Sequence, residues 1–478
     1  MAAGTVLTGH PAETAGEPAR RLRRWPWLLA WFAFLPVAVL PAGELTESDT
    51  FWQIRAGLLI LAHRALPAVD TFSWTARGKP WTLNSWGFDA VVGAAYRLAG
   101  LPGVAWACVG LTMAAAGLVL LLARRLGASP LAAGVLLLAA APLLIGWLTA
   151  RPQLADYAAM PALVLLLGRL TRGRAPLRQV AAIGVMSAVW VNLHAGALLA
   201  AVIPAACAVP LLARRQTRAA GGWCAAAAAA ALAGSLASPY GLGVFRQAMQ
   251  VQSASAGLVA EWKQVNLASP VQVLTLAAGL LALVLAVRRG DAVLTAALAV
   301  VVAGGVLAAR FQPFVILFAV PAVAARASCP PAAVLRYLRS RRVMLLRCGT
   351  AGLVAWAAVA VPSLTHIGRP DPAVYPLRVV RDIPAGCRLF NSYLLGGFVI
   401  LERPDVPVSL DSRNDLYGRQ RLLAGERTLQ GGGSLASGLR GAGCVLVTPS
   451  ERLAGRLARD PGWRRVAAGP AAILFVRR

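Results

Sequence analysis

Long apolar runs alternate with short polar connections along this chain, a pattern that predicts a polytopic membrane protein. The first run, residues 25–43, follows four arginines in residues 20–24 and is long enough to span, so we interpret it as a retained signal anchor. The later runs are 103–123, 131–149, 154–168, 181–193, 196–213, 219–237, 270–287, 292–309, 314–327 and 348–365. By the criterion of about 20 apolar residues per span, the chain has about eleven transmembrane helices.

Arginine clusters indicate the orientation of these spans. Every second connection holds arginines, and these clusters lie at 124–125, 169–178, 214–218, 288–289 and 336–347. Because such residues concentrate on the cytoplasmic side, the N-terminus is predicted to be cytoplasmic. Residues 86–101 break this agreement if they cross, so we expect them to form an interfacial or re-entrant helix on the outer side.

The expected organisation has three parts. Residues 1–24 form a disordered, basic, cytoplasmic N-terminus, and residues 25–365 form the transmembrane domain, with a first outer loop at 44–102. Residues 366–478 form a small extracytoplasmic α/β domain, because short apolar runs there alternate with Pro and Gly. Three of these runs, CRLFNS, GGFVIL and VPVSLD, are predicted strands, and the last 38 residues are predicted to form strand, helix, strand and strand.

Composition supports the membrane interpretation and excludes other classes. The chain is 58% hydrophobic and 14% charged, whereas soluble proteins have about 25% charged residues. Its net charge of +28 comes in short bursts between apolar runs, which indicates membrane topology and no nucleic-acid partner. The seven cysteines contain no CxxC pair, so a zinc site is not expected. Cys387 and Cys444 are candidates for a disulfide if their region faces an oxidising compartment.

The first outer loop begins with candidate acid–base groups. Glu44, Glu47 and Asp49 precede residues 51–65, which are predicted to form an amphipathic interfacial helix with Gln53, Gly57 and Arg64 on its polar side. In one interpretation these carboxylates are a solvated cap, with Ser48 or Asp49 as N-cap. In the other, Asp49, assisted by Glu47, is the general base of a transfer reaction at the membrane surface.

Other polar residues gather at the predicted outer ends of spans. Polar groups at such depths are costly unless they line a cavity, so we expect them to share one pocket. The candidate substrate-binding residues are Arg55, Arg151, Gln153, Asn192, His194, Tyr240, Glu261, Trp262, Arg310, Asp411 and Arg413. Alternative roles remain open: Arg151 as a snorkelling anchor, His194 as a structural residue, Trp262 as an interfacial anchor, and Asp411 and Arg413 as a buried ion-pair network.

Motifs throughout the chain resemble a family of uncharacterised polytopic bacterial membrane proteins. The shared motifs are DTFWQIRAGLLIL and LPAVDTFSWTARGKPWTLNSW in the first loop, then ARPQL, VWVNLHAGALL, SPYGL, EW, RFQPF, FNSYLLGGFVI and SLDSRNDLYG. That family is similar to the GT-C glycosyltransferases, including the dolichyl-phosphate-mannose type. The resemblance implies a GT-C-like fold and transfer of a sugar, with inversion, from a polyprenyl-phosphate donor to a cell-envelope glycan, lipid or protein at the outer face of the plasma membrane.

The resemblance also implies roles for particular residues. An acidic residue of the first outer loop acts as base or as contact to a divalent cation, and it corresponds first to Asp49 and second to Glu47. Where the family often has His, this chain has Gln53, and where the family has His-Glu it has Asn84 and Ser85. These departures leave open a catalytically silent scaffold for envelope assembly. A separate alternative is a transporter or flippase of a lipid-linked substrate.

Overall fold

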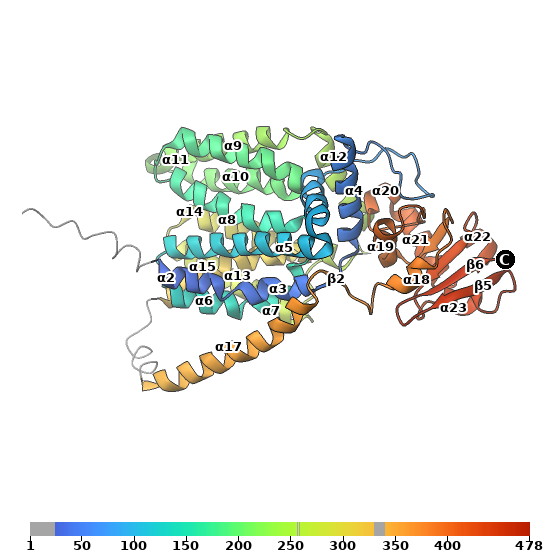
Figure 1. Ribbon diagram of the computed structural model, residues 1–478. Coiled ribbons are helices and arrows are strands. Elements are labelled where there is room, and N and C mark those ends of the chain that lie inside the picture. Colours follow the sequence, from blue (N-terminus) through green and yellow to red (C-terminus); the bar gives the residue numbers. More distant parts are fainter. Residues whose placement is uncertain (1–23, 256, 258, 329–339) are drawn as a thin grey trace, which may run out of the picture.

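A computed structural model describes residues 24–255, 257, 259–328 and 340–478. The chain is mostly helical, and a helical bundle continues at one end into a smaller region that contains a β-sheet (Figure 1). The predicted disordered N-terminus lies outside the described residues except for Arg24, and part of the arginine cluster at 336–347 lies outside them too.

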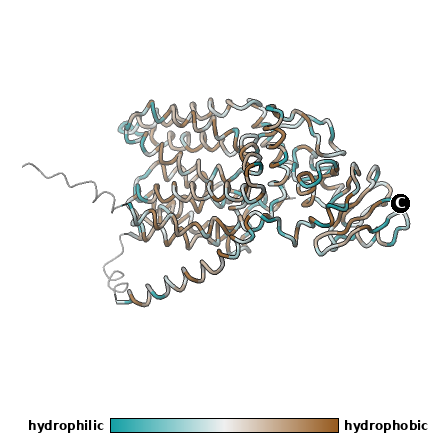
Figure 2. Tube along the Cα trace, in the orientation of Figure 1, coloured by the Kyte–Doolittle hydropathy of each residue, from teal (hydrophilic) through white to brown (hydrophobic). Residues whose placement is uncertain are grey.

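The bundle helices coincide with the predicted apolar runs. They are α2 (Trp25–Phe32), α3 (Leu35–Gly43), α5 (Trp86–Arg125), α6 (Pro130–Ala139), α7 (Ala141–Leu144), α8 (Gln153–Leu170), α9 (Pro176–Leu193), α10 (Leu199–Leu212), α11 (Arg218–Ser235), α13 (Pro270–Arg288), α14 (Ala292–Leu307), α15 (Gln312–Ala327) and α17 (Arg342–Thr365). Within the described residues, five helices, or six if a bent pair is one span, are long and apolar enough to cross a membrane. Figure 2 shows hydrophobic positions along the bundle helices. The chain is a multi-pass membrane protein.

Helix α5 is kinked where the sequence predicted a separate outer helix. Ala99 and Gly100 have non-helical backbone angles, and Gly100 has a φ of 62°, which glycine tolerates. Figure 1 shows the first part of α5 running across the end of the bundle, beside α4 (Ser48–His63). Gly57 of α4 makes this packing close, because a Cβ there would lie 1.8 Å from the carbonyl oxygen of Asp89.

The predicted polar side of α4 is wrong, because two of its residues face the interior of the protein. Gln53 and Gly57, expected on the polar side, are buried. The reason is tertiary: α4 packs on α5 through Gly57, and Gln53 lines a polar cavity. The N-cap is Glu47 and makes no side-chain cap bond, so the predicted capping by Ser48 or Asp49 is also wrong.

The C-terminal region holds a four-stranded mixed sheet. Its strands are β3 (Leu389–Asn391), β4 (Cys444–Val447), β5 (Trp463–Ala468) and β6 (Ile473–Arg477). Their order is β3-β4-β6-β5, with β3 parallel to β4 and the other pairs antiparallel. Cys387 and Cys444 are joined by a disulfide across 6.1 Å between their Cα atoms. The helices of this region are α18 (Leu377–Arg381), α19 (Gly396–Glu402), α20 (Asn414–Tyr417), α21 (Arg419–Leu429), α22 (Leu435–Gly438) and α23 (Arg452–Leu457).

One predicted strand of this region is a helix. GGFVIL lies in α19, whose residues Gly396 to Leu401 are buried. A short, fully apolar run fits a buried helix as well as a strand, so periodicity does not distinguish them. VPVSLD contributes isolated bridges through Val408 in place of a regular strand.

A buried ion cluster fastens the first outer loop to the C-terminal region. The Arg413 guanidinium donates to Asp411 through Nε at 2.8 Å and Nη2 at 2.6 Å, and to Asp70 of the first loop through Nη1 at 2.7 Å. It also lies over the Trp81 ring, 4.6 Å from the centroid. In addition, β1 (Glu44–Leu45) pairs in parallel with β2 (Arg369–Pro370). These contacts bring together chain segments that form one cavity.

Candidate functional site

A polar cavity of about 290 Å³ lies where the loops at one end of the bundle meet the C-terminal region. Parts of residues 46–53, 81–85, 151–153, 247–262 and 393–415 line it, together with His194 and Arg310. Nine of the predicted site residues therefore line one cavity: Glu47, Asp49, Arg151, Gln153, His194, Glu261, Trp262, Arg310 and Arg413.

Asp49 is a half-buried carboxylate in the first turn of α4. Its Oδ1 accepts a hydrogen bond of 3.2 Å from Trp52 Nε1, which also donates to Ser412 Oγ at 3.0 Å. Within the described part of the chain, no ion pair or second hydrogen bond occupies this carboxylate. Asp49 is therefore oriented by one neighbour and keeps an oxygen available to a ligand.

Arg151, in contrast, is already paired with two carboxylates. It donates through Nε to Glu47 at 2.7 Å and through Nη1 to Glu261 at 2.7 Å. Burial opposes its charge, but Glu47 and Glu261 outweigh burial, so the pKa of the guanidinium is raised. Burial also raises the pKa of the Glu47 carboxyl; Arg151 opposes this rise and Asp49 adds to it. Arg151 thus holds the cavity wall together.

Arg310 is a cation of a different kind. Its guanidinium lies 4.0 Å from the centroid of the Trp262 ring, in a cation–π contact. No carboxylate lies within 4.0 Å of it among the described residues. A stacked guanidinium without a carboxylate partner keeps its planar donors available for a phosphate.

His194 is held by a carboxylate that the sequence analysis missed. Its Nδ1 lies 2.6 Å from Asp156 Oδ2, and Trp190 Nε1 donates to Asp156 Oδ1 at 2.6 Å. Gly196 makes this approach feasible, because a Cβ there would lie 2.4 Å from Asp156 Oδ2. With Nδ1 engaged, Nε2 is the ring nitrogen left for a ligand.

The C-terminal region and α12 (Gly243–Ser255) supply a second polar wall. Gln247 Nε2 donates to Asp415 Oδ2 at 2.8 Å, and Asn414 Nδ2 donates to Ser255 Oγ at 3.0 Å. Burial raises the pKa of the Asp415 carboxyl, against the opposing effect of the Gln247 hydrogen bond. This wall therefore depends on groups more than 150 residues apart in the chain.

Three glutamines that line the cavity have amide oxygens without a hydrogen-bond donor in the described chain. The Oε1 atoms of Gln53, Gln153 and Gln247 are buried and have no hydrogen-bond partner in the described part of the chain. Leaving such acceptors unpaired is costly. Ligand hydroxyl groups would satisfy them.

Four predicted binding residues do not line the cavity: Arg55, Asn192, Tyr240 and Asp411. Asn192 accepts from Trp86 Nε1 at 2.7 Å and donates to the carbonyls of Ala188 and Ala237, so it joins helix ends. Asp411 is fully buried with Arg413, as the alternative of an ion-pair network predicted. Arg413 reaches the cavity, but its donors are used by Asp411 and Asp70.

Asp156 and Gln247, which the sequence analysis missed, have only weak signals in the sequence. Asp156 is an isolated carboxylate in an apolar run, which is costly without a partner and could have indicated one. Gln247 lies in a segment without a recognisable motif, and only the fold places it beside Asp415.

The described residues do not present a formed metal site. No group of three or more His, Cys, Asp or Glu side chains among them is arranged to hold an ion. Glu47, the second acidic candidate, is ion-paired with Arg151. We therefore derive no step through a divalent cation.

No protein-family model matches the chain, and no curated protein matches it in sequence. Solved structures nevertheless show a GT-C-like glycosyltransferase fold, which confirms the fold expected from the resemblance. One is the archaeal oligosaccharyltransferase AglB from Archaeoglobus fulgidus in complex with an inhibitory peptide and a dolichol-phosphate, with a TM-score of 0.58 and 12% identity over 91% of this chain and 70% of that chain. Another is ArnT from Cupriavidus metallidurans in the apo state, with a TM-score of 0.55 and 14% identity over 97% of this chain and 98% of that chain.

Proposed function

We propose that the protein is a membrane glycosyltransferase that transfers a sugar from a polyprenyl-phosphate donor to a cell-envelope acceptor, at the outer face of the plasma membrane. The observation that carries this proposal is the placement of Asp49 in one cavity with Arg310, a cation without a carboxylate partner in the described chain. The AglB structure, which has a similar fold, contains a dolichol-phosphate, a donor-type lipid phosphate.

The proposed reaction uses Asp49 as the general base. Asp49 takes the proton of the acceptor hydroxyl while that oxygen forms a bond to the anomeric carbon of the sugar. The bond between this carbon and the donor phosphate oxygen breaks, with its electron pair leaving on the phosphate, and the configuration at the carbon inverts. Arg310 stabilises the charge that develops on the leaving phosphate. The amide oxygens of Gln53, Gln153 and Gln247 accept hydrogen bonds from sugar hydroxyls.

Other cavity residues position these groups. Arg151 connects Glu47 to Glu261 and so fixes the loop before α4 against the loop that carries Trp262. We assign Arg151 this positioning role in place of the substrate-binding role expected from the sequence, because its donors already serve two carboxylates. His194 presents Nε2 beside the donor phosphate, oriented by Asp156.

The proposed topology places the cavity outside. About eleven spans, as the apolar runs predict, and a cytoplasmic N-terminus put residues 366–478 on the outer side. The disulfide between Cys387 and Cys444 supports this side, because disulfides persist in oxidising compartments. On that side the protein meets a lipid-linked donor and an envelope glycan, lipid or protein as acceptor.

The test is replacement of Asp49 by Asn, which keeps the size of the side chain but removes the base. In cells that lack the native chain, the D49N variant should fail to restore the envelope glycans that the wild-type chain restores, as measured by mass spectrometry. An exposed aspartate supplies the control: D382N removes a carboxylate at an exposed position outside the cavity and should restore the glycans. Normal glycans with D49N, at equal amounts of protein in the membrane, would refute the assignment.

A further inference from the structure

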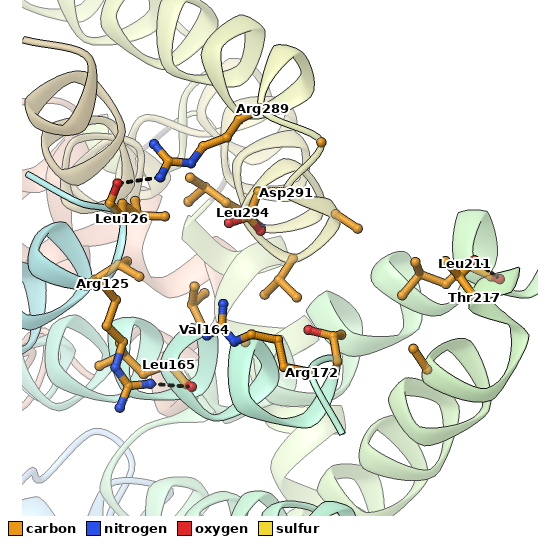
Figure 3. Close-up of a pocket in the computed structure, with 17 residues that line it drawn as sticks. Arg125, Leu126, Val164, Leu165, Arg172, Leu211, Thr217, Arg289, Asp291 and Leu294 are labelled. Atoms are coloured by element: carbon orange, nitrogen blue, oxygen red, sulfur yellow. Dashed lines mark hydrogen bonds between the residues drawn. The ribbon is translucent and has the colours of Figure 1, made fainter. Parts of the chain in front are cut away.

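A second pocket, of about 350 Å³, lies at the other end of the helical bundle. It is formed by the C-terminal ends of α5 and α8, the turn after α13 and the start of α14. We call it the basic pocket, because Arg125, Arg172 and Arg289 line it from three different chain segments (Figure 3).

The positive charge of the basic pocket is not neutralised within the described chain. Arg125 donates to the carbonyl of Leu165 at 3.2 Å, and Arg289 donates to the carbonyl of Leu126 at 2.5 Å. These neutral contacts hold the two side chains in place but leave their charges unpaired. No carboxylate lies within 4.0 Å of any of the three guanidinium groups in the part of the chain that the structure describes.

One acidic residue, Asp291, also lines the pocket, and it is the N-cap of α14. Its Oδ1 accepts from the backbone N–H of Leu294 at 3.0 Å and caps the helix. Three arginines and one aspartate therefore leave a net charge of two positive charges around the pocket (Figure 3). Such an arrangement favours an anion with several acceptor oxygens.

The position of the basic pocket along the bundle and its apolar wall indicate which kind of anion it binds. α8 begins at Gln153 in the Asp49 cavity and ends at Leu170, beside the basic pocket. Its 18 residues span about 27 Å, close to the hydrocarbon thickness of a bilayer, about 30 Å. The two pockets thus lie near opposite membrane surfaces. Between the arginines the wall is apolar, formed by Leu122, Val164, Leu165, Leu211 and Val293.

We propose that the basic pocket binds the phosphate headgroup of an anionic phospholipid, at the membrane surface opposite the Asp49 cavity. Guanidinium groups hold the phosphate oxygens, and the apolar wall contacts the glycerol and the first acyl carbons. Basic pockets between transmembrane helices bind anionic headgroups in this way. This inference does not depend on the proposed glycosyl transfer.

Binding of a short-chain fluorescent phosphatidylglycerol to the full-length protein in neutral detergent tests the proposal. Wild type should bind this lipid more tightly than the matching phosphatidylcholine, which has no net charge. The double variant R172Q/R289Q should raise the Kd about tenfold, because it removes two charge-assisted contacts. The matched control R174Q/R288Q removes two charges from exposed arginines nearby that do not line the pocket, and should change the Kd less than about twofold.

Three outcomes would overturn the proposal. If both double variants weaken binding equally, diffuse surface charge accounts for it. If phosphatidylcholine binds as tightly, anionic charge is not recognised. If inorganic phosphate displaces the fluorescent lipid at a phosphate concentration equal to the Kd of that lipid, the ligand is soluble phosphate. Because R289Q also removes a backbone contact, R172Q alone serves as a second variant. The Arg172 side chain makes no hydrogen bond or ion pair within the described chain, so its loss should still raise the Kd with the melting temperature unchanged.

Discussion

The Arg413 side chain joins the two chain segments that form one side of the cavity, because it pairs with Asp70 and with Asp411. It is 2% exposed and satisfies two carboxylates that are also buried, Asp70 and Asp411. Tyr417 Oη donates to Asp411 at 2.6 Å and completes the cluster. Because the first loop has no long regular element between α4 and α5, this cluster is a main constraint on the segment that carries Trp81 into the cavity.

Replacing Arg413 by Gln should therefore destabilise the protein strongly. Two buried carboxylates lose their cation, and removal of one member of a buried ion pair costs about 3–5 kcal/mol. Thermal unfolding in detergent measures this loss. R421Q removes an exposed arginine of the same region and should leave the midpoint nearly unchanged; equal effects of the two variants would contradict the role of the cluster.

Asp415 should give the stability of the protein a defined dependence on pH. Because burial raises its pKa, the folded chain keeps this proton at pH values above the ordinary aspartate pKa of about 3.9, where the unfolded chain has lost it. Its contribution is full below the ordinary pKa and declines as the pH rises through the raised pKa. The difference in melting temperature between wild type and D415N should shrink accordingly from low to neutral pH. A constant difference would show that Asp415 does not titrate this way.

Two helices far apart in sequence fix the position of Asp49. Gly397 at the start of α19 packs against the start of α4 so closely that a Cβ there would lie 2.2 Å from the carbonyl oxygen of Ser48. Because the obstacle is backbone, it has little freedom to yield. The neighbouring Trp52 then orients the Asp49 carboxylate.

The G397A variant should separate α19 from α4. We expect a loss of roughly 1–3 kcal/mol of stability from overpacking, together with a loss of the proposed transferase activity as Asp49 moves. Melting temperature and activity are the measurements. G455A offers the matched control, because Gly455 is also helical but has open space around it, and Ala favours helix. A wild-type melting temperature for G397A would contradict this account.

Helices formed by long apolar runs could be predicted from the sequence. The structure of short apolar runs could not. The apolar runs all lie in helices because a run of this length has few other ways to satisfy its backbone in a membrane. GGFVIL is ambiguous at six residues, and its two glycines permit close packing against the backbone of Leu410 and Ser48, which no local pattern indicates. The face of α4 depends on the Gly57 contact with Asp89, which no local pattern encodes.

The site was predictable to the extent that topology determines it. Glu47, Arg151 and Glu261 were expected at the same outer surface, and the structure joins them in one ion-pair chain. Their pairing with one another was not predictable, because the sequence fixes which end of a span a residue occupies but not its nearest partner. That pairing is the reason that Arg310, and not Arg151, is the cation proposed to meet the donor phosphate.

At the scale of the whole molecule, the proposed topology places the two ends of the bundle in different compartments. In a chain whose free cysteines are replaced, Q264C should react with an impermeant maleimide in intact cells. Q216C should react with it only after the cells are permeabilised. Both positions are exposed, and they lie near the Asp49 cavity and near the basic pocket respectively. Equal labelling of both in intact cells would contradict the proposed topology.

The wall contributed by residues 393–415 also has a consequence for biosynthesis. A ribosome that has made every bundle helix has still not supplied Tyr393, Ser412 or Asp415, so the cavity is incomplete until residue 415 has been translated. A product truncated before residue 393 therefore lacks this wall of the cavity, and we expect it to be unable to bind the proposed donor.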